Sequence, residues 1–254
     1  MTKYFSFIAI CLLILPSTVF ATTVDSHYLL DYGALQPANS LLDHPIVNSS
    51  QGITQLAIDM SGLTTPLSLS ASDFSFHVGN SSDPTSWSVL TATPVINVAM
   101  GAGVAGSDRV TFDFSGITDN WIEVTTLPTV NSGLASPDYF YAGSMVGDVN
   151  GDAAVSPIDS LMIINSLNAL GNHPATANDP MDINRDGLIS PIDSLIIINK
   201  LNAPDSTLQL QAFKPQGDYA NPKPPTVPLP PSIWLFISGV IVLTSKAGVL
   251  RPKN

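Results

Sequence analysis

Residues 148–168 read DVNGDAAVSPIDSLMIINSLN, and residues 182–202 read DINRDGLISPIDSLIIINKLN. The second stretch repeats the first at an offset of 34 residues, which indicates one small structural unit built twice. Both copies carry oxygen-bearing side chains at positions 1, 3, 5, 9 and 12 of a 12-residue loop. In the first copy these are Asp148, Asn150, Asp152, Ser156 and Asp159, and in the second they are Asp182, Asn184, Asp186, Ser190 and Asp193.

This spacing has a reason in the chemistry of hard cations. Ca²⁺ takes about six to eight oxygen ligands at roughly 2.3–2.6 Å. A 12-residue loop wraps such an ion if alternate side chains point inward together with the main-chain carbonyl at position 7, which belongs to Ala154 in one copy and Leu188 in the other. The repeat therefore predicts two bound calcium ions, one in each loop.

The two loops differ at position 6, where the chain must turn sharply. The second loop has Gly187 there, but the first has Ala153, which costs about 1 kcal/mol if φ is positive. We therefore expect the first site to be the weaker one. Position 8 is apolar in both copies, as Val155 and Ile189, and we expect these residues to join the two loops through a short backbone bridge.

Each loop runs directly into a predicted helix. Ser156 and Ser190 suit the N-cap, a proline follows each at the first helical position, and Asp159 and Asp193 complete a capping box. The helices are unusually apolar, and one stripe of each should pack helix against helix. The remaining apolar residues either pack on the preceding domain, which we favour, or form a docking face for a partner. The apolar set is Ile158, Leu161, Met162, Ile163, Ile164, Leu167, Ile192, Leu195, Ile196, Ile197, Ile198 and Leu201.

Aspartate rather than glutamate at position 12, together with duplicated units of one loop and one helix without an entering helix, resembles a type I dockerin domain over residues 147–202. The resemblance implies calcium binding and attachment to a cohesin-like partner, as in assemblies of polysaccharide-degrading enzymes. In dockerins the residues at loop positions 10 and 11, commonly Ser-Thr, help to select the cohesin. Here these candidate partner-binding residues are Pro157, Ile158, Pro191 and Ile192.

The preceding region, residues 22–145, shows short runs of alternating apolar and polar residues separated by turn residues. Such runs predict an antiparallel β-sandwich, and the region resembles the bacterial Ig-like domains of surface proteins. Examples of these runs are 53–59, 73–78, 86–92, 95–100, 109–114 and 120–126.

No catalytic constellation is recognisable in this region, so we expect a non-enzymatic protein. Residues 101–106 (GAGVAG) match a dinucleotide-binding fingerprint in form, but a strand rather than a helix is predicted to follow them, which favours a hairpin loop. Trp87, Trp121, Tyr139 and Tyr141 are expected to serve in packing rather than as a platform for sugar rings.

The two ends of the chain have the character of targeting signals. Residues 1–21 have the basic start, apolar run and small-residue cleavage site of a secretory signal peptide. A Pro-rich linker (205–226) precedes a tail, 227–254, in which Val227, Pro228, Leu229 and Pro230 lead into a predicted transmembrane helix at 232–250 and then basic residues. This tail resembles the PEP-CTERM sorting signal in its VPLP variant, which implies processing by an exosortase. A permanent single-span anchor is the alternative.

The composition argues against nucleic-acid binding and against a disulfide. The formal net charge is -11 with 9 Lys and Arg residues, which argues against nucleic acid as a partner. The single cysteine, Cys11, lies within the predicted signal peptide, so the mature chain is predicted to contain no disulfide.

The sequence therefore predicts a multidomain protein exported to the cell envelope or extracellular matrix. It would have an N-terminal all-β sandwich (22–145), a small α-helical EF-hand-like dockerin pair (146–204) and a C-terminal single transmembrane helix. Its dockerin would bind two Ca²⁺ ions and attach to a cohesin-like or other envelope protein. The alternative is a carbohydrate-binding accessory component of an extracellular polysaccharide-degrading assembly.

Overall fold

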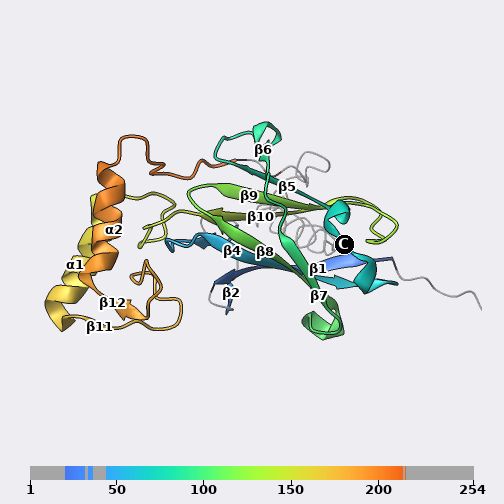
Figure 1. The fold of residues 1–254 in the computed structure, drawn as a ribbon, viewed down its shortest axis with the longest axis horizontal. Coiled ribbons are helices and arrows are strands. Elements are labelled where there is room, and N and C mark those ends of the chain that lie inside the picture. The colour runs from blue at the N-terminus through green and yellow to red at the C-terminus, as the bar shows by residue number, and fades with distance from the viewer. Residues whose placement is uncertain (1–20, 32–33, 37–43, 214, 216–254) are drawn as a thin grey trace, which may run out of the picture. The chain divides into compact units, whose positions relative to one another are not determined.

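A computed structural model describes residues 21–31, 34–36, 44–213 and 215 of the chain. Its first part consists of two five-stranded sheets (Figure 1). The first sheet has the strand order β2-β1-β4-β8-β7 and is antiparallel throughout. Its strands are β1 (Thr23–Asp31), β2 (Ala34–Gln36), β4 (Ile53–Ser61), β7 (Val95–Ala99) and β8 (Asp108–Ile117).

The second sheet has the strand order β3-β10-β9-β5-β6. Its pairs are antiparallel except for β3 and β10, which run parallel. Its strands are β3 (Ile46–Val47), β5 (Phe74–Gly79), β6 (Ser88–Val89), β9 (Trp121–Thr126) and β10 (Asp138–Ser144). Among the described residues, four short 3-10 helices lie in the connections of the two sheets, at Pro66–Ser68, Ala71–Asp73, Pro84–Ser86 and Val104–Gly106.

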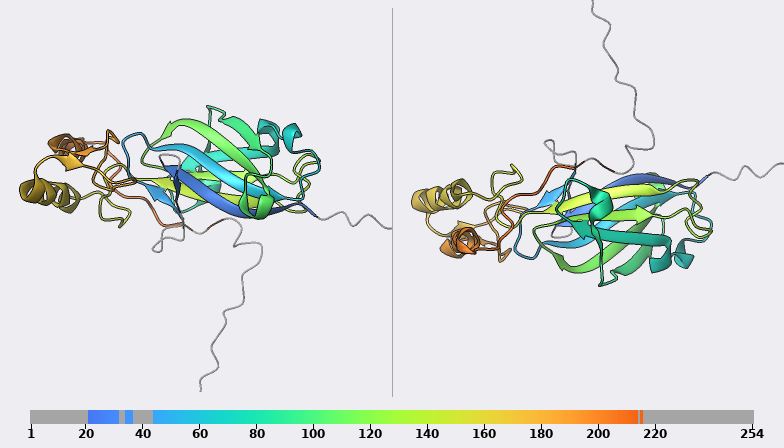
Figure 2. Two further views of the ribbon diagram at one scale, coloured as in Figure 1. Left: turned by 90° about the horizontal axis from the view of Figure 1, so that it is seen from below. Right: turned by 90° about the horizontal axis from the view of Figure 1, so that it is seen from above.

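The two sheets lie face to face as separate layers (Figure 2), and a hydrophobic core fills the space between them. Phe112 of β8 packs edge-on against Phe74 and Phe76 of β5, at ring-centroid distances of 4.8 and 5.6 Å. Leu29, Leu56 and Val110 of the first sheet and Ile122 and Val124 of the second are almost fully buried in the same core. The arrangement is therefore sandwich-like, with the inward-facing residues of both sheets forming the core.

The predicted strands at 53–59, 73–78, 95–100, 109–114 and 120–126 correspond to β4, β5, β7, β8 and β9. The prediction at 86–92 was too long, because only Ser88–Val89 is strand, paired with the end of β5. Residues 101–106 connect β7 to the antiparallel β8, so they form a hairpin connection as predicted. The strands β1, β2, β3 and β10 were not among the predicted runs.

The second part contains the repeat. Helix α1 (Pro157–Leu170) and helix α2 (Pro191–Asn202) lie side by side, and a two-stranded ladder joins β11 (His173–Pro174) to β12 (Leu188–Ile189) (Figures 1 and 2). No helix in the described part of the chain has the length and apolarity needed to cross a membrane. The predicted sorting motif and transmembrane helix lie outside the described residues, as does the predicted signal peptide apart from its last residue.

Candidate calcium loops and docking face

The Ser-Pro-Ile-Asp sequence at the end of each loop starts a helix, as predicted. The carboxylate of Asp159 accepts a hydrogen bond from the Ser156 main-chain N–H at 2.8 Å, and the Ser156 hydroxyl accepts one from the N–H of Ile158 at 3.2 Å. The second copy repeats this with Asp193 and Ser190 at 2.9 Å. These bonds satisfy main-chain donors that the first helical turn leaves unpaired. Positions 9 and 12 of each loop are thereby held rigidly.

The aspartate at position 1 organises the turn of each loop. Asp148 Oδ1 accepts hydrogen bonds from the N–H groups of Gly151 (2.8 Å) and Asp152 (3.1 Å), and its Oδ2 accepts one from Ala153 (2.8 Å). Asp182 makes the equivalent bonds with Asp186 and Gly187. The first six residues of each loop therefore curl around a buried carboxylate.

The aspartate at position 12 closes the loop from the other end. Asp159 Oδ1 accepts hydrogen bonds from the N–H groups of Val149 (2.9 Å) and Asn150 (3.2 Å), while its Oδ2 takes part in the helix cap. Asp193 does the same with Ile183 and Asn184. Both carboxylates are 0% exposed. Each loop is therefore a closed ring whose ends are joined through one carboxylate.

The donor chemistry of each ring fits calcium, because every predicted ligand atom is an oxygen. Asn150 and Asp152 lie together in the first loop, with the Asn150 amide donating to the Asp152 carboxylate at 2.9 Å, and Asn184 and Asp186 are placed identically. Among the described residues no group of three or more His, Cys, Asp or Glu side chains is arranged to hold a metal ion. Each predicted ligand set adds amide, hydroxyl and main-chain oxygens to its carboxylates.

The electrostatics of the first loop also fit a cation. Burial raises the pKa of the Asp148 carboxyl to about 6, and the neighbouring charges of Asp152 and Asp159 act in the same direction. The N–H groups of Ala153 and Gly151 oppose this rise. A cation between these carboxylates would remove the repulsion that adds to the effect of burial on this pKa.

The backbone of the loops bears out one expectation and changes another. Ala153 has φ +65°, so the non-glycine residue at position 6 does adopt the strained left-handed conformation that was anticipated. At position 4, however, the second loop has Arg185 at φ +60° where the first has Gly151 at φ +75°. Each loop thus contains one strained non-glycine residue, and backbone strain gives no reason to rank the first site as the weaker.

The expected bridge between Val155 and Ile189 is absent, and that prediction was wrong. Val155 N–H donates instead to Leu208 O at 2.7 Å, and Ile189 pairs with His173. The extended segment that follows each helix thus pairs with the loop of the other copy. These segments satisfy the main-chain groups that a direct loop-to-loop bridge would have used.

The apolar helix residues divide into two sets. Ile163 and Ile197 are fully buried in a hydrophobic cluster that also contains Trp121 and Tyr141 of the sandwich. A second set is exposed to between 36 and 60%, and we call it the apolar helix face: Ile158, Leu161, Met162, Ile164, Ile192, Leu195 and Ile198. The preceding domain does not cover this face, contrary to the alternative that we favoured.

This face carries no exposed charge. Asp159 is the one ionisable residue of α1 and is buried, and in α2 Asp193 is buried while the Lys200 side chain is only 9% exposed. A groove of about 450 Å³ runs between the two helices on this face, lined by Ile164, Leu167, Asn168, Pro191, Ser194, Leu195 and Ile198. The candidate partner-binding residues Pro157, Ile158, Pro191 and Ile192 are all exposed at the helix starts.

The predicted aromatic residues do not form an open platform. Trp87, Trp121 and Tyr141 are at most 6% exposed, and Tyr139 is half-buried. Trp87 meets Tyr141 edge-on at an interplanar angle of 84°, so the rings are not coplanar. Their role in packing agrees with expectation, and the arrangement gives no support to a sugar-stacking surface.

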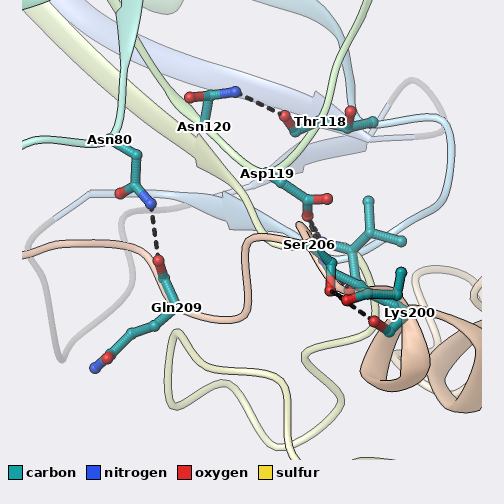
Figure 3. A network of polar contacts seen from close by, with 9 residues as sticks. Asn80, Thr118, Asp119, Asn120, Lys200, Ser206 and Gln209 are labelled. Carbon is teal, nitrogen blue, oxygen red and sulfur yellow. Dashed lines mark hydrogen bonds and ion pairs between the residues drawn. The ribbon is translucent and has the colours of Figure 1, made fainter.

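Several residues that join the two parts of the molecule were not anticipated. Lys200 of α2 forms an ion pair with Asp119, which precedes β9 (Figure 3). Lys200 also donates to Val146 O at 2.9 Å. Asn48, beside β3, donates to the main-chain oxygens of Asp148 (3.0 Å) and Pro180 (2.7 Å), and it accepts from Arg185. Arg185 and Lys200 are the two positions at which the second copy has a basic residue and the first does not, a signal that comparing the copies would have revealed.

Comparison with known families agrees with the repeat. The family model of the Dockerin type I domain matches residues 146–202. Type I dockerins bind calcium and attach proteins by binding cohesin partners, and they occur in extracellular and cell-surface proteins. No curated protein and no solved structure matches the chain. The dockerin match covers the loops, both helices and the apolar helix face, and it leaves the β-sheet region unassigned.

Proposed function

We propose that this protein is a non-catalytic surface component whose dockerin segment binds one Ca²⁺ ion in each loop and attaches the sandwich to a cohesin-like partner. The predicted ligands are the residues at positions 1, 3, 5, 9 and 12 of each loop together with the carbonyls of Ala154 and Leu188. The predicted signal peptide and sorting tail would place this attachment at the cell envelope.

The observation that carries the docking proposal is the uncharged, exposed apolar helix face. Ile158 and Ile192 are 60% and 55% exposed at equivalent positions of the two copies. Contiguous apolar surface of this kind is uncommon on soluble proteins and marks sites of interaction. Because proline and isoleucine stand where dockerins commonly have serine and threonine, the partner is expected to present an apolar rather than a hydroxyl-binding surface.

The experiment is a pull-down from the envelope proteins of the producing cell with the purified chain, in calcium and in EDTA. Calcium-dependent capture of one partner is expected, followed by its purification and titration against the chain. The double variant Ile158→Asp/Ile192→Asp should weaken the binding at least tenfold, since each charge would be buried without a counter-ion. Val130→Asp, at a residue 93% exposed on the sandwich, is the matched control and should bind normally.

Two results would reject the proposal. Capture that is equally strong in EDTA would show that the calcium loops do not shape the docking face. Equal binding by the double variant and by Val130→Asp would show that the partner contacts another surface.

A further inference from the structure

The segment that follows α2, residues 208–213, connects the first loop to the sandwich, and we call it the strap. It lies within the region predicted to be a Pro-rich linker, yet Leu210 is only 3% exposed. In Figure 1 it is the orange chain that leaves α2 and runs to the sheets. The strap makes contacts both with the first loop and with the sandwich.

On one side the strap pairs with the first loop. Leu208 O accepts the hydrogen bond from Val155 N–H at 2.7 Å, and Leu210 N–H donates to Ala153 O at 2.9 Å. Between these two bonds Ala154 and Gln209 form an antiparallel bridge. The strap therefore binds the main chain of the loop on both sides of position 7.

On the other side the strap is bound by the sandwich. The Asn80 side chain donates from Nδ2 to Gln209 O at 2.8 Å (Figure 3) and accepts at Oδ1 from Gln211 N–H at 2.6 Å. Trp121 Nε1–H donates to Gln211 O at 3.0 Å. The Phe213 ring then packs edge-on against Trp87 and Trp121, at centroid distances of 4.9 and 5.1 Å.

One peptide group links the strap to the proposed calcium site. The N–H of Val155 and the C=O of Ala154 belong to the same planar trans peptide, so they point in opposite directions. The N–H is bonded to the strap, which directs the Ala154 carbonyl toward the loop, where the ligand at position 7 is expected. An ion that fixes this carbonyl would also fix the N–H that holds the strap.

The second loop is tied to the sandwich by a different route. Its equivalent residue, Leu188, pairs with Pro174 of β11 inside the dockerin segment. This loop contacts the sandwich through Ser50 N–H, which donates to Ile183 O at 2.8 Å, and through Arg185, which donates to Asn48. The two loops therefore have separate reporters, Gln211 N–H for the first and Ser50 N–H for the second.

We propose that calcium bound in the first loop stabilises the hydrogen bonds of the strap, and through the strap the contacts between the dockerin segment and the sandwich. Calcium bound in the second loop does not have this effect. This inference rests on the proposed calcium site of the first loop. Because coupling between two sites is reciprocal, a fastened strap must also raise the calcium affinity of the first loop by the same factor.

The test is amide hydrogen exchange of the full-length chain, titrated with calcium chloride, alongside isothermal titration calorimetry of the same samples. Calcium should slow exchange at Leu210 and Gln211 by about tenfold, a typical coupling factor. Asp152→Ala, at the exposed position 5 of the first loop, should abolish this slowing. Asp186→Ala, its equivalent in the second loop, should preserve the slowing at the strap.

A second pair of variants tests the reverse direction. Asn80→Ala removes both side-chain bonds to the strap and should weaken calcium binding at the first loop by about the same tenfold factor. Asn97→Ala, which removes a hydrogen bond to Asp113 on the exposed face of the first sheet, should leave calcium affinity unchanged.

The outcomes separate this inference from the function on which it rests. If the chain takes up calcium but strap exchange does not respond, or responds equally to Asp152→Ala and Asp186→Ala, the coupling is overturned and the calcium sites remain. If calorimetry detects no calcium uptake, both proposals fail together.

Discussion

The hydroxyl of Ser160 lies 2.8 Å from that of Ser194, and both serines are buried between α1 and α2. The two residues are 34 positions apart, the same offset as the sequence repeat. Equivalent residues thus meet where the copies pack together, and the repeat in sequence is also an approximate symmetry in space. A substitution in one copy therefore has its control at the residue 34 positions away.

Removal of calcium should destabilise the dockerin segment. An ion that binds only the folded loop stabilises it by about 2.7 kcal/mol when its free concentration is 100 times Kd. We expect EDTA to lower the thermal midpoint and the helical signal in circular dichroism. The double variant Asp152→Ala/Asp186→Ala should show the lower midpoint with or without EDTA. An unchanged midpoint in the unsubstituted chain would contradict this prediction.

Substitutions at position 6 of the two loops should change the free energy of unfolding by unequal amounts. Gly187→Ala should cost about 1 kcal/mol, since φ is +85° there and a new Cβ would meet nothing within 4 Å. Ala153→Gly relieves similar strain but loses a buried methyl group worth about 0.8 kcal/mol, so its net effect should be close to zero. Urea unfolding in saturating calcium measures both. A gain of more than about 1 kcal/mol for Ala153→Gly would show that the methyl group contributes nothing.

Loss of the Lys200 ammonium group should weaken the junction. Its side chain is 9% exposed beside Asp119, so Lys200→Met removes a charge-assisted bond from a largely buried place, at a cost of about 2 kcal/mol. Ser166→Ala, at the equivalent position of the first copy, should change stability by less than about 0.5 kcal/mol. A double-mutant cycle with Asp119→Ala tests whether the cost comes from this pair. A coupling energy near zero would assign the cost to lost packing instead.

Acid should destabilise the sandwich partly through Asp59. Burial alone would raise the pKa of this carboxyl, but the hydrogen bonds from Arg109 and from Val104 N–H outweigh burial and hold the pKa below its usual 3.8. The two Asp59 oxygens accept from Arg109 Nε and Nη2 at 2.7 and 2.8 Å.

Because the unfolded chain binds this proton more readily, the contribution of Asp59 is present above about pH 3.8 and is lost as the pH falls through the lower folded value. We expect the unfolding free energy of Asp59→Asn to vary less steeply with pH in this acid range than that of the unsubstituted chain. Denaturant titrations at a series of pH values measure the slopes, and equal slopes would contradict the assignment.

The repeat could be predicted well because its determinants are local. Capping residues, helix starts and loop positions depend on neighbours within about 12 residues. Ser156, Pro157 and Asp159 accordingly occupy the N-cap, first and third helical positions that were expected. The positive φ at Ala153 followed from its loop position in the same way.

The two long strands that were missed, β1 and β10, lacked the alternation that reveals a half-buried strand. In β10 every residue from Phe140 to Ser144 is buried, so apolar and polar residues do not alternate. In β1 the pairing register with β4 shifts between Val24 and Ser26, which disturbs the period of two. Both strands therefore depend on their neighbours in the sheet rather than on local pattern.

The junction was hidden for a different reason, since its contacts join residues far apart in the chain. Asn80 and Gln209 are 129 positions apart, and Lys200 and Asp119 are 81. No local pattern indicates such pairs. The basic residues Arg185 and Lys200, which have no basic counterpart in the first copy, are the feature of the sequence that could have indicated these contacts.

The three residues between β10 and the first loop have a mechanical consequence. Met145 N–H and Gly147 N–H donate to Val47 O and Asn48 O, which continues the pairing of β10 with β3 up to the loop. If the sandwich is held in place and a docked partner is pulled, tension passes along the axis of β10, which is hydrogen-bonded on both edges. Such a load must break many backbone hydrogen bonds at once rather than one after another. The connection between β10 and the first loop should therefore resist force.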